Sequence, residues 1–77
     1  MIKSKMTKLG EYLAKKSVNK SEISRKTGLS SPRLSELSAK PRAKLRASEL
    51  YLIALAIEAD PCELLKYVCG DLKLKKD

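Results

Sequence analysis

The chain has 77 residues, of which 34% are charged, and a formal net charge of +8. This length allows one domain with a small core, so each buried aliphatic side chain matters. No apolar run is long enough to span a bilayer, and the basic N-terminus lacks the apolar segment of a signal peptide. We therefore expect a cytoplasmic protein without a membrane partner.

The positive charge is concentrated in the first half of the chain. Residues 1–46 hold thirteen Lys or Arg residues against three acids, a net +10, whereas residues 47–77 hold four against six, a net −2. A merely solvated surface explains a small excess of one sign, but an excess confined to one half favours a polyanionic partner.

Residues that support catalysis or metal binding are scarce. The sequence has no His and two Cys, and Cys62 and Cys69 on one helix would lie about 10 Å apart along its axis, too far for an internal disulfide. There is no base to activate a nucleophile, no glycine-rich phosphate loop and no cluster of metal ligands. We therefore expect that the protein is not an enzyme and that it binds no cofactor, metal or small-molecule substrate.

The first helix is predicted over residues 7–16. Residues 1–5 form a basic N-terminal arm that we place outside the domain. Apolar residues then recur at helical spacing, at Met6, Leu9 and Leu13, with Tyr12 beside them. Gly10 within this helix costs up to about 1 kcal/mol against Ala, unless another helix packs closely there.

Residues 19–39 are predicted to form two short helices joined by a tight turn. Asn19 and Glu22 have the spacing of a capping box at the start of the first helix. Gly28 supplies the left-handed residue that ends it, and Ser30 can cap the second helix. This pattern predicts a helix-turn-helix motif.

Residues 19–30, Asn-Lys-Ser-Glu-Ile-Ser-Arg-Lys-Thr-Gly-Leu-Ser, resemble the first half of the motif of the Cro/CI-type (XRE-type) helix-turn-helix family. Residues 50–65, which end in Glu-Leu-Leu, resemble that family's fourth and fifth helices, so the similarity covers residues 6–68. The resemblance implies an all-α fold, a compact five-helix lambda-repressor-like DNA-binding domain over residues 6–69. A basic, flexible tail over residues 70–77 would follow it.

The second helix of the motif, over residues 31–39, carries the residues that we expect to contact bases. Leu34 and Leu37 point inward, and with roughly 100° per residue the opposite arc faces outward. The resemblance places base contacts at Ser31, Pro32 and Glu36, with Arg33 and Ser35 as neighbours. Hydroxyls can donate or accept, a Glu can accept from cytosine N4, an Arg can bind guanine or phosphate, and a Pro can contact a thymine methyl. Small polar residues are nevertheless common on any soluble helix surface.

A second set of residues is predicted to contact DNA phosphates. Lys20 lies at a helix start, where free amides and the positive helix end attract phosphate, and in the family the basic loop after the second helix of the motif follows the DNA backbone. The candidates are Lys20, Ser30, Lys40, Arg42, Lys44 and Arg46. A solvated lysine and a plain basic loop are the alternatives.

Two more helices are predicted in the second half of the chain. Residues 47–58 carry two apolar stripes, one with Leu50 and Ile53 and the other with Leu52 and Leu55, which predicts a helix buried nearly all round. One stripe can cover the helix-turn-helix, and the other a fifth helix or a second subunit. Asp60 caps a fifth helix that ends at Gly70. Its expected inward face consists of Pro61, Leu64, Leu65 and Val68.

Two classes of function fit this sequence. The first is a sequence-specific DNA-binding transcription regulator, repressor-like or the antitoxin of a toxin–antitoxin pair. It would act at the nucleoid as a homodimer on a two-fold operator in double-stranded DNA, with helix 31–39 in the major groove. The second is a helical protein-interaction adaptor that uses the apolar fourth helix and binds nucleic acid only non-specifically. Duplex affinity that falls steeply with salt yet keeps a sequence preference favours the first class.

Overall fold

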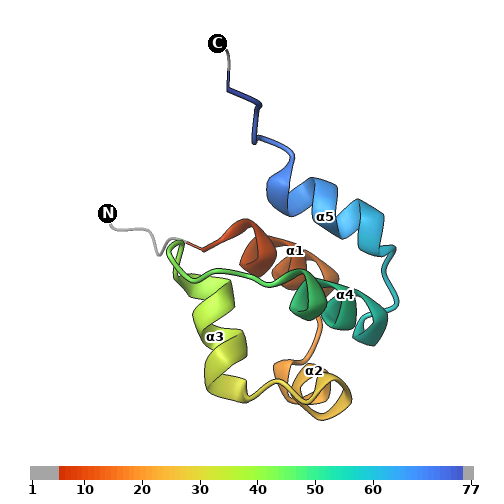
Figure 1. The fold of residues 1–77 in the computed structure, drawn as a ribbon. Helices are drawn as coiled ribbons and strands as arrows, with labels where there is room; N and C mark the ends of the chain where they lie inside the picture. Colours follow the sequence, from red (N-terminus) through yellow and green to blue (C-terminus); the bar gives the residue numbers. More distant parts are fainter. Residues whose placement is uncertain (1–5, 76–77) are drawn as a thin grey trace.

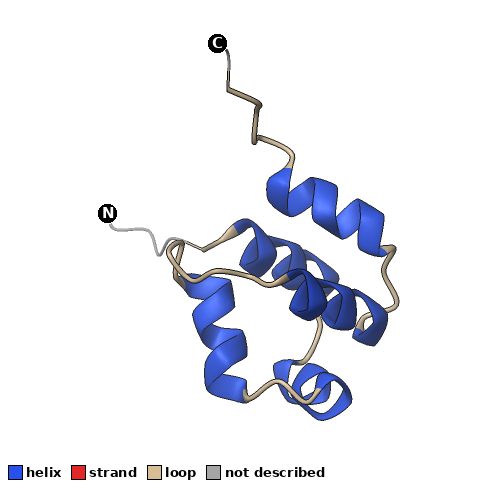
Figure 2. Ribbon diagram, viewed as in Figure 1, coloured by secondary structure: helices blue, strands red, loops and turns tan. Residues whose placement is uncertain are grey.

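Five helices make up the fold over residues 6–75, which are the residues that the computed structural model describes (Figures 1 and 2). The helices are α1 (Lys8–Lys16), α2 (Lys20–Thr27), α3 (Ser31–Ala39), α4 (Ala47–Ala56) and α5 (Pro61–Cys69). The described part of the chain contains no strand, which confirms the all-α, five-helix prediction. None of these helices combines the length and apolarity that crossing a membrane requires.

The structure describes only part of the two predicted terminal segments. The arm assigned to residues 1–5 lies outside the described residues, as do residues 76–77 of the tail. After α5 the described residues 70–75 form a turn and then a segment without regular structure, in which Leu72 and Leu74 are 74% and 94% exposed.

The helices begin close to where their capping residues predict. Thr7 is the residue before α1 rather than its first residue, and its hydroxyl accepts a 3.0 Å hydrogen bond from the Gly10 amide. The Asn19 side chain caps α2 by accepting from the Ser21 amide at 2.8 Å. The predicted capping box with Glu22 is wrong, because the Glu22 carboxylate lies 2.7 Å from the Arg25 guanidinium instead.

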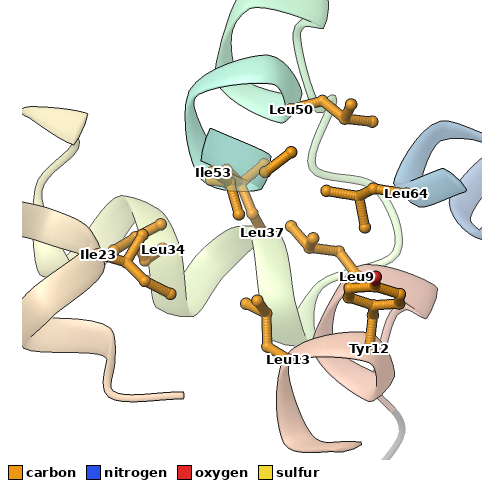
Figure 3. Packing of buried hydrophobic residues seen from close by; sticks show 10 residues of the cluster. Leu9, Tyr12, Leu13, Ile23, Leu34, Leu37, Leu50, Ile53 and Leu64 are labelled. Carbon is orange, nitrogen blue, oxygen red and sulfur yellow. The ribbon is translucent and has the colours of Figure 1, made fainter. Parts of the chain in front are cut away.

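One apolar core joins all five helices (Figure 3). It consists of Leu9, Tyr12, Leu13, Ile23, Leu34, Leu37, Leu50, Ile53, Ala54 and Leu64. Met6, which the sequence pattern places on the buried stripe of α1, is 48% exposed, because it precedes the helix and lies beyond its packed face. A core this small makes stability sensitive to every one of its side chains.

Helix α4 is buried on one side only, contrary to the predicted burial nearly all round. Its stripe with Leu50 and Ile53 faces α2 and α5, whereas Leu52 and Leu55 are 38% and 52% exposed. The helix also ends at Ala56, two residues before the predicted end, and Glu58 in the following turn has a left-handed backbone with φ of 59°. This chain alone leaves an apolar arc of α4 uncovered.

Helix α5 presents its predicted inward face to the core except at Leu65, and half-buried Val68 packs against the core there. Leu64 is fully buried, but Leu65 is 49% exposed, so the prediction that Leu65 points inward is wrong. Half-buried Tyr67 faces inward instead, and its ring lies edge-to-face against Tyr12 of α1 with 5.2 Å between the centroids. The aromatic pair is one of the contacts that hold α5 against α1.

The start of α1 lies against the C-terminal end of α3. The Thr7 hydroxyl donates to the Leu37 carbonyl at 2.7 Å, and the Thr7 amide donates to the Ser38 carbonyl at 3.0 Å. Gly10 is buried at this crossing, and a Cβ atom there would overlap the Ser38 carbonyl oxygen. The close packing that a glycine in this helix requires is therefore present.

Replacing Gly10 with Ala tests this crossing. We expect Gly10→Ala to lower the free energy of unfolding by about 1 to 3 kcal/mol, because the added methyl group forces α1 and α3 apart. Without the crossing the same change would stabilise the helix by up to about 1 kcal/mol. Urea unfolding followed by circular dichroism measures the change, with exposed Ala14→Gly as the control for helix propensity. A higher midpoint for Gly10→Ala would contradict the packing of α1 on α3.

Candidate nucleic-acid interface

Helix α3 has one face in the core and the opposite face open. Leu34 and Leu37 are 0% and 3% exposed, as predicted, while Pro32 and Ser35 on the other side are exposed. An open hollow of about 580 Å³ runs along this outer face, lined by Ser30, Pro32, Arg33, Ser35, Glu36, Ala39 and Lys40. No described part of the chain packs over it.

The turn between α2 and α3 is fixed by short-range hydrogen bonds. Gly28 has φ of 82°, a left-handed conformation that glycine adopts without strain. The Ser24 hydroxyl donates to the Leu29 carbonyl at 2.6 Å, so it ties α2 to the turn. Ser30 then caps α3 by accepting from the Arg33 amide at 3.2 Å. These bonds confirm the helix-turn-helix and fix the direction in which α3 leaves α2 (Figure 1).

Arg33 connects α3 to the start of α4. Its Nε atom donates to Glu49 Oε2 at 3.0 Å and its Nη2 atom to Glu49 Oε1 at 3.2 Å. Nη2 also donates to the Lys44 carbonyl at 2.9 Å, and Nη1 donates to Glu36 Oε1 at 3.1 Å. One guanidinium group thus holds two carboxylates and the backbone of the loop.

Glu49 is a neighbour of the candidate interface that the sequence analysis missed. It is 6% exposed, and it also accepts a 2.9 Å hydrogen bond from the Arg46 amide at the start of α4. The signal was present, because an acid in the third position of a helix commonly bonds back to the residue before the helix. What the spacing does not reveal is that the same carboxylate meets Arg33 from another helix.

The ion pair shifts the pKa values of both partners toward the charged forms. Hydrogen bonds from Arg33 hold the pKa of Glu49 below its ordinary value, although burial opposes the shift. The hydrogen bond to Glu49, helped by the one to Glu36, raises the pKa of Arg33. The pair is therefore fully charged at neutral pH.

The remaining predicted contact residues lie on the surface. Ser31 is exposed in the first turn of α3, and Glu36 keeps 45% of its side chain exposed beside Arg33. The predicted phosphate contacts are all exposed: Lys20 in the first turn of α2, Ser30 before α3, and Lys40, Arg42, Lys44 and Arg46 between α3 and α4. The basic loop continues from the end of α3, whereas Lys20 comes from the other helix of the motif.

The cysteines do not take part in this face. Cys62 is exposed and Cys69 is half-buried, both on α5, and both thiols are free. Within residues 6–75 no group of three or more His, Cys, Asp or Glu side chains gathers where it could hold a metal ion.

Two short helices joined at Gly28, with the outer face of the second one uncovered, define a helix-turn-helix domain. A family model of the Cro/C1-type HTH DNA-binding domain matches residues 8–70, and the chain belongs to this family. Membership implies binding to double-stranded DNA and, in general terms, a DNA-binding regulator. No curated protein and no solved structure matches the chain.

The lowered pKa of Glu49 predicts how stability depends on acid. The unfolded chain binds a proton at this carboxyl more readily than the folded chain does, so stability from the ion pair is present above the ordinary pKa of 4.5 and is lost as pH falls through the folded value. Glu49→Gln should lower stability at pH 7 and flatten its decline below about pH 5.

Urea unfolding at a series of pH values measures this dependence. Glu22→Gln is the matched control, because the pKa of Glu22 is also lowered by a hydrogen bond from an arginine, Arg25, but the pair is solvent-exposed. We expect Glu22→Gln to keep most of the wild-type slope. An unchanged slope in Glu49→Gln would contradict the ion pair.

Proposed function

We propose that this protein is a sequence-specific transcription regulator that inserts α3 into the major groove of DNA and acts by binding rather than by catalysis. The observation that carries this proposal is the uncovered outer face of α3, opposite buried Leu34 and Leu37, in a chain of a DNA-binding family. A major groove about 12 Å wide admits one α-helix with its side chains.

The proposed base contacts lie in the first turns of α3. Ser31, Pro32, Ser35 and Glu36 reach the outer face of the helix, where they can meet base edges in the groove. Arg33, which the sequence analysis adds to this set, would have to leave Glu49 and the Lys44 carbonyl to reach a base.

The proposed phosphate contacts supply affinity without sequence preference. They are Lys20, Ser30, Lys40, Arg42, Lys44 and Arg46, and their support is exposure together with the net +10 of residues 1–46. Each cation that meets a phosphate releases a counterion, so binding should weaken as salt rises.

We also propose a homodimer on a two-fold operator, as a repressor or as an antitoxin that acts at the nucleoid. The support is the apolar surface that one chain leaves uncovered, with Leu52 and Leu55 on α4 and Leu65 on α5. A second copy of this chain or a toxin protein could cover these side chains. The same observation favours the second candidate function, a protein-interaction adaptor that binds nucleic acid only non-specifically.

Selection of bound duplexes from a random pool separates the two functions. The regulator should enrich one shared sequence that contains an inverted repeat, with an affinity that falls steeply as salt rises. Equal and weak binding to all duplexes would contradict the regulator and favour the adaptor.

Glu36→Ala tests the base contacts. We expect this variant to lose preference at one base position of each half-site by about 1 to 3 kcal/mol, because its carboxylate no longer accepts from a base. The same duplex selection, repeated with the variant, measures the change, and exposed Glu63→Ala on α5 is the control. An unchanged preference would remove Glu36 from the interface.

Replacing Lys44 and Arg46 together with Ala tests the phosphate contacts. The slope of log K against log salt should become shallower by roughly 0.9 for each lost contact, while base preference stays the same. Fluorescence anisotropy over a salt series measures the slope. Lys66→Ala with Lys73→Ala removes two exposed cations from α5 and the tail and should leave it unaltered. Equal slopes for the two double variants would rule out phosphate contacts by Lys44 and Arg46.

A further inference from the structure

We propose that Arg33 is a positioning residue for sequence recognition, which orients the Glu36 carboxylate on the outer face of α3 and does not itself contact DNA. This inference rests on the proposed function, since it concerns how α3 selects a sequence. It departs from the expectation that Arg33 contacts a base. Three properties of the Arg33 side chain support it, namely its hydrogen bonds, its charge balance and its link to Glu36.

The hydrogen-bond donors of Arg33 are nearly all in use. A guanidinium group has five N–H donors. Two of them reach the Glu49 carboxylate, one reaches the Lys44 carbonyl and one reaches the Glu36 carboxylate. A bidentate contact with guanine needs two donors side by side. One free N–H cannot provide it while these bonds hold.

The charge around Arg33 also argues against a phosphate contact. Its single positive charge lies between the carboxylates of Glu49 and Glu36, at 3.0 and 3.1 Å. The three groups together carry a net charge of −1, which does not attract a phosphate. The pairing has another effect, because it offsets the negative charge of Glu36 and so lowers the repulsion when α3 approaches a polyanion.

The hydrogen bond from Arg33 leaves one oxygen of the Glu36 carboxylate able to accept a hydrogen bond from a base. Arg33 donates to Oε1 of Glu36, and 45% of the Glu36 side chain is exposed. Oε2 can therefore accept from a cytosine amino group while Oε1 is held. Glu49 is 6% exposed and anchored to the start of α4, so it fixes Arg33, and Arg33 in turn fixes Glu36.

A set of four variants tests this role, namely Arg33→Met, Glu36→Ala, the double variant of both, and the control Arg25→Met. Arg25 pairs with Glu22 at the same three-residue spacing, but on α2. Duplex selection gives base preference for each protein, and anisotropy over a salt series gives the salt slope. Arg33→Met should relax preference roughly five- to tenfold at the base position that Glu36→Ala affects. The double variant should show no further loss, since both changes remove one contact.

The salt slope of Arg33→Met should change by much less than the roughly 0.9 expected for a lost phosphate contact, and Arg25→Met should keep the wild-type preference. The proposal is overturned if Arg33→Met relaxes a different base position, if the losses multiply in the double variant, or if the slope falls by a full contact. An unchanged preference in Glu36→Ala overturns it as well. A wild-type protein without any base preference would instead defeat the proposed function, and this inference with it.

Arg33→Met can unfold the protein, because it leaves the buried Glu49 carboxylate without its cation. If Arg33→Met does not fold, Arg33→Met with Glu49→Gln removes the unpaired charge. We expect this double variant to lose the same preference, at the base position that Glu36→Ala affects. Circular dichroism confirms folding before selection. A folded double variant that keeps the full wild-type base preference would overturn the proposal.

Discussion

The burial of Leu34 and Leu37 is the constraint on which the rest of this structure depends, because it decides which side of α3 remains free. Both leucines enter a core to which all five helices contribute (Figure 3). The two ends of the helix are then fixed separately, the first by the Ser30 cap and the second by Thr7, which precedes α1, and by Gly10 within α1. A helix held in this way presents a constant outer face, which is what recognition of a rigid duplex requires.

The positively charged side chains of α3 and of the loop that follows it fall into two groups with different surroundings. The cations of the loop between α3 and α4 are exposed and available to phosphates, whereas the Arg33 guanidinium is committed to Glu49, Glu36 and the Lys44 carbonyl. The bond to that carbonyl also ties the basic loop to α3. Formal net charge therefore overstates how many cations a DNA backbone can meet. The half-buried ion pair fixes the position of the Arg33 side chain, and in the proposed function the exposed loop would supply the attraction to DNA phosphates.

Local signals in the sequence were enough to predict the helices, the turn at Gly28 and the inward leucines of α3, since each depends on neighbours within one or two turns. They were insufficient where a residue finds its partner in another helix. Leu65 and Tyr67 lie close together on α5, and Tyr67 finds its partners, among them the ring of Tyr12, on α1. Likewise, no spacing pattern in the sequence predicts that Arg33 binds Glu49, sixteen residues away. The outer face of α3 was predictable, but the network that organises it was not.

The central claim is that the outer face of α3 meets DNA, and amide chemical-shift mapping tests it most directly. A duplex obtained by selection is titrated into ¹⁵N-labelled protein, and shift changes are followed for each backbone amide. The account predicts the largest changes at Ser31, Ser35 and Glu36 and in the loop over residues 40–46. Changes confined to the exposed apolar sides of α4 and α5, with α3 unaffected, would contradict it.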